Sequence, residues 1–366
     1  MMLLSLIPLA VSLVLAPAAP VLSRCLAPRL AAPLLTLLAL ATSLATGIVL
    51  CLAAFIAVAR LPLAARLGQW STEPLQAGQP GPGWGVLAGA VASILLAAAV
   101  VFAARAIRDL ARAARACREL DPDAGARAGG GVPAGAGAGP GVRDRVRAMI
   151  SAVTGAGRVI ITEDERPLAY AVPLPAGAIV VSTGMLRLLS AAERRAILAH
   201  ESAHLRQCHA LYVLLADLAA RANPLLRPLA AQVRLATELA ADERAADEVG
   251  DRRVVARALA RASLAARGGR PGGIPAGTVP AGSPGGLAIA DTHAGTRVRV
   301  LLSPPRRRRP WAAATALALT LASAGAAVTL TLTTHQQIES AQLAYEHAHP
   351  AALAEAGPHH ELTVRR

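Results

Sequence analysis

The sequence predicts an α+β fold in which a small sheet and several active-site helices lie between membrane-spanning helices. Three observations lead to this fold class. Apolar residues make up 54% of the 366-residue chain, and its mean hydropathy is +0.46. Four segments are apolar enough to cross a bilayer, which takes about 20 residues per helix. Between the last two of them, short strand-like segments are followed by longer helical ones.

The four expected spans carry most of the hydrophobicity. Their approximate limits are Met1–Leu22, Ala31–Val58, Trp84–Ala104 and Trp311–Thr333. The first contains Ala16-Pro17-Ala18-Ala19, which resembles a signal-peptide cleavage site. It begins without a positive charge, however, so we expect a retained helix rather than a cleaved leader.

The positions of the arginines predict the orientation. One cluster follows the third span and another precedes the fourth: Arg105, Arg108, Arg112, Arg115 and Arg118, then Arg306, Arg307, Arg308 and Arg309. Both clusters flank the same central region, and positive charge is retained on the cytoplasmic side of membranes. We therefore expect a multi-pass cell-membrane protein with a cytoplasmic central region and both termini outside.

Membrane orientation also accounts for the strong positive charge of the chain. A formal net charge of +14 and a pI near 11.3 would also fit a nucleic-acid-binding protein. Because the arginines cluster beside apolar segments, we expect the lipid bilayer as a partner and no nucleic acid. The four cysteines form no Cys-x-x-Cys pair, which argues against a disulfide framework or a cysteine zinc cluster.

Composition divides the chain into five parts. We expect three spans with the first arginine cluster (1–118), a Gly/Ala-rich linker (119–142), a central domain (143–305), a fourth span (306–333) and a histidine-bearing tail (334–366). The linker contains too few large apolar residues to form a core. In the central domain the expected strands are Arg158–Thr162, Leu168–Val172 and Ala178–Ser182, and the expected helices include Arg143–Val153, Leu229–Glu248 and Arg253–Ala266.

A metal-binding pattern lies on the helix that starts at the capping box formed by Ser190 and Glu193. His200 and His204 are one turn apart on this helix, so both imidazoles can bind one metal ion. Glu201, beside the first histidine, would be directed toward a metal-bound water. Zinc lowers the pKa of such a water toward neutrality, and Glu201 would take its proton and pass it to the leaving amine.

A catalytic zinc site needs three protein ligands and an open position. We expect Glu238 on a later helix to be the third ligand; the alternative is a solvated carboxylate on a helix face. Asp242 lies one turn further on the same face, where it can accept the free ring N–H of a zinc-binding histidine. The expected cofactor is one Zn²⁺ per chain, bound by His200, His204 and Glu238.

Two residues that follow the metal-binding pattern, Cys208 and His209, are not expected to be ligands. If the helix continues, Cys208 shares the face of His204, and its thiol would lie near the metal. We expect Cys208 to fill a small buried position instead, since the ligand set does not need it. His209 lies off this face and is expected to have a structural role.

The segment Leu168–His209 resembles the core of the membrane gluzincin metallopeptidases. These include the HtpX-like quality-control peptidases and the antirepressor (BlaR/MecR-like) peptidases of beta-lactam sensing. The resemblance rests on the strand and turn Ala178–Leu186 and on Ala199-His200-Glu201-Ser202-Ala203-His204. Asn223-Pro224, the short spacing to Glu238, and the order of three spans, peptidase and one span are more similar to the antirepressor branch.

The resemblance implies further roles. Ala169, Tyr170 and Ala171 would form an edge strand to which a substrate peptide adds; the alternative is an ordinary sheet edge. Arg297 could stabilise the developing oxyanion, although Ala294 replaces the proline of the family's His-Pro pattern. The alternative role of Arg297 is a membrane-proximal positive charge. The tail, His335–Arg366, does not resemble a penicillin-binding sensor domain, so nothing outside the membrane supports a role in beta-lactam sensing.

The predicted function is therefore that of an integral-membrane zinc endopeptidase acting in regulated proteolysis or membrane-protein quality control. Its partner would be a protein or peptide substrate, such as a cytoplasmic repressor or a membrane protein. The alternative is a catalytically silent membrane sensor or scaffold with a structural zinc site. Glu201 favours the enzyme, because a structural site has no use for a base at that position.

Overall fold

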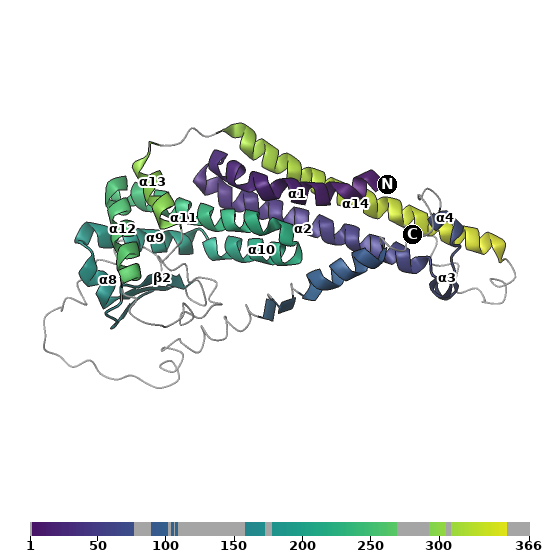
Figure 1. Ribbon diagram of the computed structural model, residues 1–366, viewed down its shortest axis with the longest axis horizontal. Helices are drawn as coiled ribbons and strands as arrows, with labels where there is room; N and C mark the ends of the chain where they lie inside the picture. The colour runs from purple at the N-terminus through teal and green to yellow at the C-terminus, as the bar shows by residue number, and fades with distance from the viewer. Residues whose placement is uncertain are drawn as a thin grey trace.

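The computed structural model describes residues 2–76, 89–101, 104–105, 107–108, 158–172, 178–268, 293–304 and 309–349. Figure 1 shows a bundle of long helices that continues, at one end, into a smaller unit of a sheet and shorter helices. The linker and the expected helix Arg143–Val153 lie outside the described residues.

Three helices are long and apolar enough to cross a membrane: α1 (Met2–Cys25), α2 (Pro28–Ala59) and α14 (Pro310–Ala348). They contain three of the four expected spans. Of the third expected span, the structure describes a shorter apolar helix, Gly89–Val101. The helix α14 continues past Thr333 to Ala348, so the first part of the expected tail is helical. Large apolar side chains on the outer faces, such as Leu44, Leu321 and Leu332, are exposed in the absence of lipid.

Two short helices, α3 (Pro62–Gly68) and α4 (Glu73–Gln76), lie at the far end of the bundle. The indole Nε1–H of Trp70 donates to the carbonyl of Ala59 at 2.8 Å, and the backbone N–H of Ser71 donates to the carbonyl of Ala341 at 2.9 Å. These contacts join the end of α2 to the extended part of α14.

The sheet has three strands, β1 (Arg158–Thr162), β2 (Ala169–Val172) and β3 (Ala178–Ser182). Their order is β1-β3-β2, with β1 parallel and β2 antiparallel to the central β3, so β2 is an edge strand. The predicted strands are confirmed, with β2 starting one residue later than expected. Ser182 then caps α8 (Thr183–Leu188), because its hydroxyl accepts the backbone N–H of Met185.

The remaining helices are α9 (Ala191–Arg206), α10 (His209–Ala222), α11 (Arg227–Val249), α12 (Arg252–Gly268) and α13 (Ala294–Leu302), with a 3₁₀ turn η1 (Pro224–Leu226) before α11. The predicted capping box of Ser190 and Glu193 is present at the start of α9. The helix α10 was not expected from the sequence.

Two apolar cores hold these elements. One joins the sheet to α9 and α12 through side chains such as Ile179, Leu198 and Leu259. The other joins α10, η1 and α11 to the long helices and includes Leu35 and Leu229. The helix α11 contributes to both cores, since Val233 belongs to the second and Ala245 to the first.

Candidate metal centre

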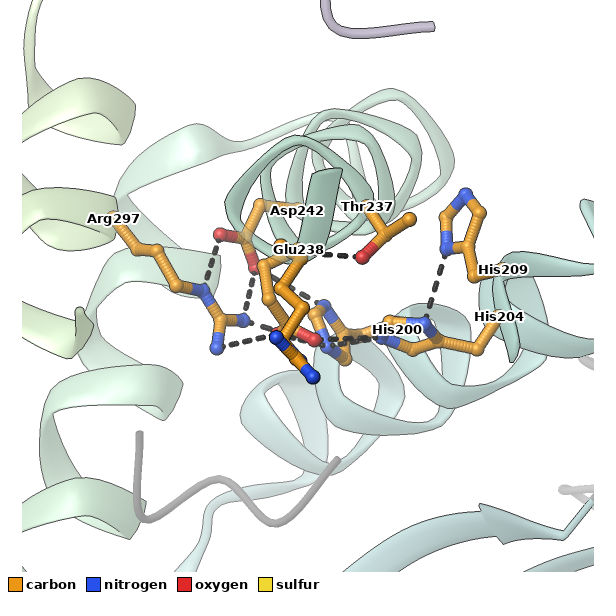
Figure 2. Close-up of polar contacts among 8 residues, drawn as sticks. His200, His204, His209, Thr237, Glu238, Asp242 and Arg297 are labelled. Atoms are coloured by element: carbon orange, nitrogen blue, oxygen red, sulfur yellow. Dashed lines mark hydrogen bonds and ion pairs between the residues drawn. The ribbon is translucent and has the colours of Figure 1, made fainter. Parts of the chain in front are cut away.

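The centre forms where α9 crosses α11. From Ala196 to His204 every residue of α9 is buried, because the helix lies between the sheet and the helices behind it. His200 and His204 therefore point the same way from consecutive turns, and Glu238 approaches them from α11 (Figure 2). All three residues are buried, with 3–5% of their surface exposed.

The donor atoms fit a single metal ion. The Nε2 atoms of His200 and His204 are 3.0 Å apart, and each lies 3.5 Å from an oxygen of Glu238. Ligands about 2.0–2.1 Å from a tetrahedral zinc ion lie about 3.3 Å from one another, so little rearrangement would be needed. The described residues thus bring together a His-His-Glu group that can hold a metal ion.

Asp242 and Arg297 form a layer behind these ligands. Nδ1 of His200 lies 3.0 Å from a carboxylate oxygen of Asp242, which fixes the ring so that Nε2 faces the metal position. Nε and Nη2 of Arg297 donate to both oxygens of Asp242 at 2.8 and 2.7 Å, and Nη1 lies 2.7 Å from Glu238. Arg297 therefore holds two carboxylates of α11 in place from α13 (Figure 2).

This arrangement contradicts one interpretation of Arg297. Its side chain is only 1% exposed, so it is not a membrane-proximal charge at the protein surface. All three guanidinium nitrogens contact carboxylates, so Arg297 links Asp242 and Glu238 to α13. The geometry instead gives Arg297 a positioning role. Sequence spacing alone gave no sign of these two ion pairs.

The side chain of His209 contacts His204, although its position off the face of the helix had indicated only a structural role. Its Nδ1 lies 3.0 Å from Nδ1 of His204, and the two rings meet edge to face. Burial lowers the pKa of His209 to about 4, so its ring is neutral near pH 7. A neutral His209 can accept the Nδ1–H of His204, which leaves Nε2 of His204 available to a metal.

Cys208 does not occupy the buried position that was expected. The helix α9 ends at Arg206, and Cys208 has a left-handed backbone with a φ of 52°. Residues after Arg206 therefore do not continue the face of α9 that carries His200 and His204. The thiol of Cys208 is exposed, and Cys208 does not belong to the metal-binding group.

Glu201 has the environment of a base. It is 1% exposed, and neither carboxylate oxygen makes a well-aligned hydrogen bond to a described residue. Burial raises the pKa of Glu201 to about 7, with Glu238 adding to this effect and His200 and Arg297 opposing it. A carboxylate with a pKa near neutrality can both accept and return a proton at physiological pH.

The members of the His-His-Glu group are electrostatically coupled. Burial alone would lower the pKa of His200, but hydrogen bonds to Asp242 and Glu238 outweigh it and raise the pKa to about 9. Burial would raise the pKa of Glu238, but Arg297 and His204 hold it far below its usual value. Glu238 is thus a carboxylate at any working pH, as a metal ligand must be.

The edge strand β2 lies beside Glu201. It packs against α9, and the backbone N–H of Ala171 lies close enough to Glu201 to lower its pKa slightly. Ala169 and Ala171 face the core, whereas Tyr170 is half-buried. The outer edge of β2 is not paired to another strand among the described residues.

The fold and the site together define a protein with long apolar helices, suited to a membrane, and a buried metal-binding group of metallopeptidase type. Residues 142–223 match the family model described as Peptidase family M48, which consists of zinc metallopeptidases. The match supports a gluzincin-type metallopeptidase. It covers His200, Glu201 and His204 and ends before Glu238. Neither the curated proteins nor the solved structures gave a match to the chain.

Proposed function

We propose that this chain is an integral-membrane zinc endopeptidase that binds one Zn²⁺ through His200, His204 and Glu238. The observation that carries the proposal is the pairing of this compact donor group with Glu201, a buried carboxylate whose oxygens lack well-aligned partners. A bound zinc ion would supply a Lewis acid that lowers the pKa of water and polarises a peptide carbonyl.

Residues of the chain would carry out proton transfer and hold the metal ligands in place. Glu201 takes a proton from the attacking water and delivers it to the leaving amine. Asp242 and His209 hold the rings of His200 and His204 through their Nδ1 atoms. Arg297 keeps Glu238 and Asp242 oriented when the centre loses its metal.

A substrate peptide would bind in extended form along β2. Its backbone would add to the outer edge of β2, at Ala169, Tyr170 and Ala171, antiparallel or parallel to the strand. Because Ala171 lies next to Glu201, a peptide on this edge would present a carbonyl close to the base. Burial of β2 against α9 supports the proposal, since it fixes the edge relative to the metal ligands.

The cellular setting is also a proposal. The arrangement of three spans, a peptidase unit between the third and fourth spans, and cytoplasmic orientation rests on the arginine clusters and the three long apolar helices. Asn223-Pro224 at the turn between α10 and α11 supports the antirepressor branch. The substrates would be a cytoplasmic repressor or a membrane protein, cleaved in regulated proteolysis or quality control.

The test compares the full chain and its Glu201→Gln variant, each purified in detergent and loaded with zinc. We expect the wild type to cleave an unstructured protein and Glu201→Gln to lose about 10²–10⁴-fold in rate, the usual contribution of a general base. Both should retain zinc. Glu248→Gln, a carboxylate change on α11 outside the centre, is the matched control and should cleave normally.

Two results would contradict the proposal. A wild-type protein that holds zinc but cleaves neither a range of unstructured proteins nor itself would favour a silent sensor or scaffold. Equal cleavage by wild type and Glu201→Gln would assign the activity to a contaminant or to another site.

A further inference from the structure

The helices α10 and α11 form a hairpin that lies lengthwise against the membrane-type helices. The hydroxyl of Thr36 donates to the carbonyl of Tyr212 at 3.4 Å, and the hydroxyl of Ser43 donates to that of Ala219 at 3.2 Å. These contacts join both ends of α10 to α2, so the two helices run side by side, as Figure 1 shows. The hairpin therefore extends along the bundle rather than away from it.

The tip of the hairpin is fixed by a buried polar contact. Nδ2 of Asn223 donates to the hydroxyl of Ser12 at 2.8 Å and lies 3.4 Å from that of Thr46. Ser12 and Thr46 lie in the interior of the apolar helices Leu6–Cys25 and Pro28–Ala59. The start of α2 lies beside the unit that holds the metal centre, since Arg29 pairs with Asp247 of α11. Thr46 precedes the end of α2 at Ala59 by about 20 Å of helix, at 1.5 Å per residue. If that end lies at the opposite surface of an apolar layer about 30 Å thick, the tip lies about 10 Å inside the nearer surface, within one leaflet.

The side chains of the hairpin agree with such a position. Leu226, Leu229 and Val233 belong to the same core as α1, α2 and α14. On the outer face, Leu211 and Leu225 are 50% and 40% exposed in the absence of lipid. Both would lie among acyl chains.

The charged residues of the hairpin limit how far it inserts. Asp217 on α10 forms an ion pair with Arg234 on α11. Arg221 and Arg227 are exposed near the tip, and arginine side chains can extend toward the polar surface of a membrane while their stems stay in the apolar layer. These charges suit a hairpin that enters one leaflet and returns to the side from which it came.

We propose that α10, η1 and the first half of α11 form a re-entrant hairpin in the leaflet next to the metal centre, with lipid acyl chains as its partner. The contacts of Asn223 with Ser12 and Thr46 anchor its tip. Glu238 follows Arg227 by about 17 Å of the same helix. The membrane therefore holds the metal centre close to its surface, independently of whether the centre is catalytic.

Spin-label accessibility in liposomes tests this proposal on the full chain. Cys25, Cys51, Cys117 and Cys208 are first replaced by alanine, and single cysteines are then introduced by Leu225→Cys at the tip, Arg244→Cys on the exposed far part of α11, and Leu321→Cys on the outer face of α14. Each label is measured for collisions with oxygen, which concentrates in the apolar layer, and with a water-soluble nickel complex.

We expect the label at position 225 to resemble that at 321, with several-fold fewer nickel collisions and more oxygen collisions than at 244. Nickel access at 225 equal to that at 244 would overturn the proposal by placing the hairpin in water. Exclusion of both reagents at 225 would also overturn it, because the partner would then be protein. In the same background, Asn223→Ala should raise nickel access at 225 several-fold, and an unchanged value would remove Asn223 as the anchor.

Discussion

Replacing Arg297 tests whether the ion pairs behind the ligands hold the centre together. The side chain is 1% exposed, contacts Asp242 through two nitrogens at 2.7–2.8 Å, and lies 2.7 Å from Glu238. In Arg297→Ala, two buried carboxylates lose their cation. Breaking a buried ion pair from one side costs about 3–5 kcal/mol of folding free energy. Bound zinc would give Glu238 a new cation, so the cost should be smaller in the metal-loaded protein.

The assay is thermal unfolding of the full chain in detergent, with a chelator or with zinc, followed by circular dichroism at the helix band. At about 2–4 °C per kcal/mol, the metal-free Arg297→Ala variant should melt about 6–20 °C below wild type. Arg299→Ala is the matched control, because Arg299 is exposed on the same helix and its loss should cost within about 0.5 kcal/mol. Arg297→Lys should fall between them, since an ammonium group cannot contact Asp242 through two nitrogens.

Two outcomes would refute this reasoning. Equal melting of Arg297→Ala and Arg299→Ala in chelator would show that the pairs contribute nothing to stability. A larger loss with zinc than without it would show that Arg297 acts on the metal-loaded site in a way that the ion pairs do not explain.

Three further predictions concern the metal. Glu238→Ala should reduce bound zinc well below one per chain by atomic absorption, whereas Glu248→Ala should not; full zinc retention would remove Glu238 from the ligand set. His209→Ala should weaken zinc about 10–100-fold in competition with a chromogenic chelator, because Nδ1–H of His204 loses its acceptor; unchanged affinity would make His209 a packing residue. The pKa of His200 is raised to about 9, so zinc binding at pH 7 should displace a proton from its ring. Calorimetry in buffers of different ionisation enthalpy should detect about one proton released for each zinc ion bound. No release would contradict a protonated His200.

The elements that local rules define could be predicted from the sequence. Strand limits followed from short β-branched runs between turn residues, and the start of α9 followed from its capping box. The grouping of His200, His204 and Glu238 rested on helical spacing and on the number of ligands that zinc needs, and the structure brings these residues together.

Features that depend on tertiary contacts were not predicted from the sequence. Residues 209–222 are too short for a span and carry Asp217 and Arg221, so α10 was not recognised; its partner is α2, far away in the sequence. Cys208 was misplaced because a helical-face argument holds only while the helix lasts, and α9 ends at Arg206. Burial of Arg297 depends on how α13 packs against α11, which spacing along the chain does not encode.

The helix α11 links the packing of the metal centre to the packing of the membrane-type helices. Its first half packs in the core of α1 and α2, its last turns pack in the core of the sheet and α12, and Glu238 lies between them. Because an α-helix is stiff over this length, a shift of either core would move Glu238 relative to His200 and His204 on α9. Excising residues 143–305 would also expose the apolar stripe that includes Leu229 and Val233. The spans therefore do more than tether the peptidase unit, since part of the surface that positions a metal ligand belongs to them.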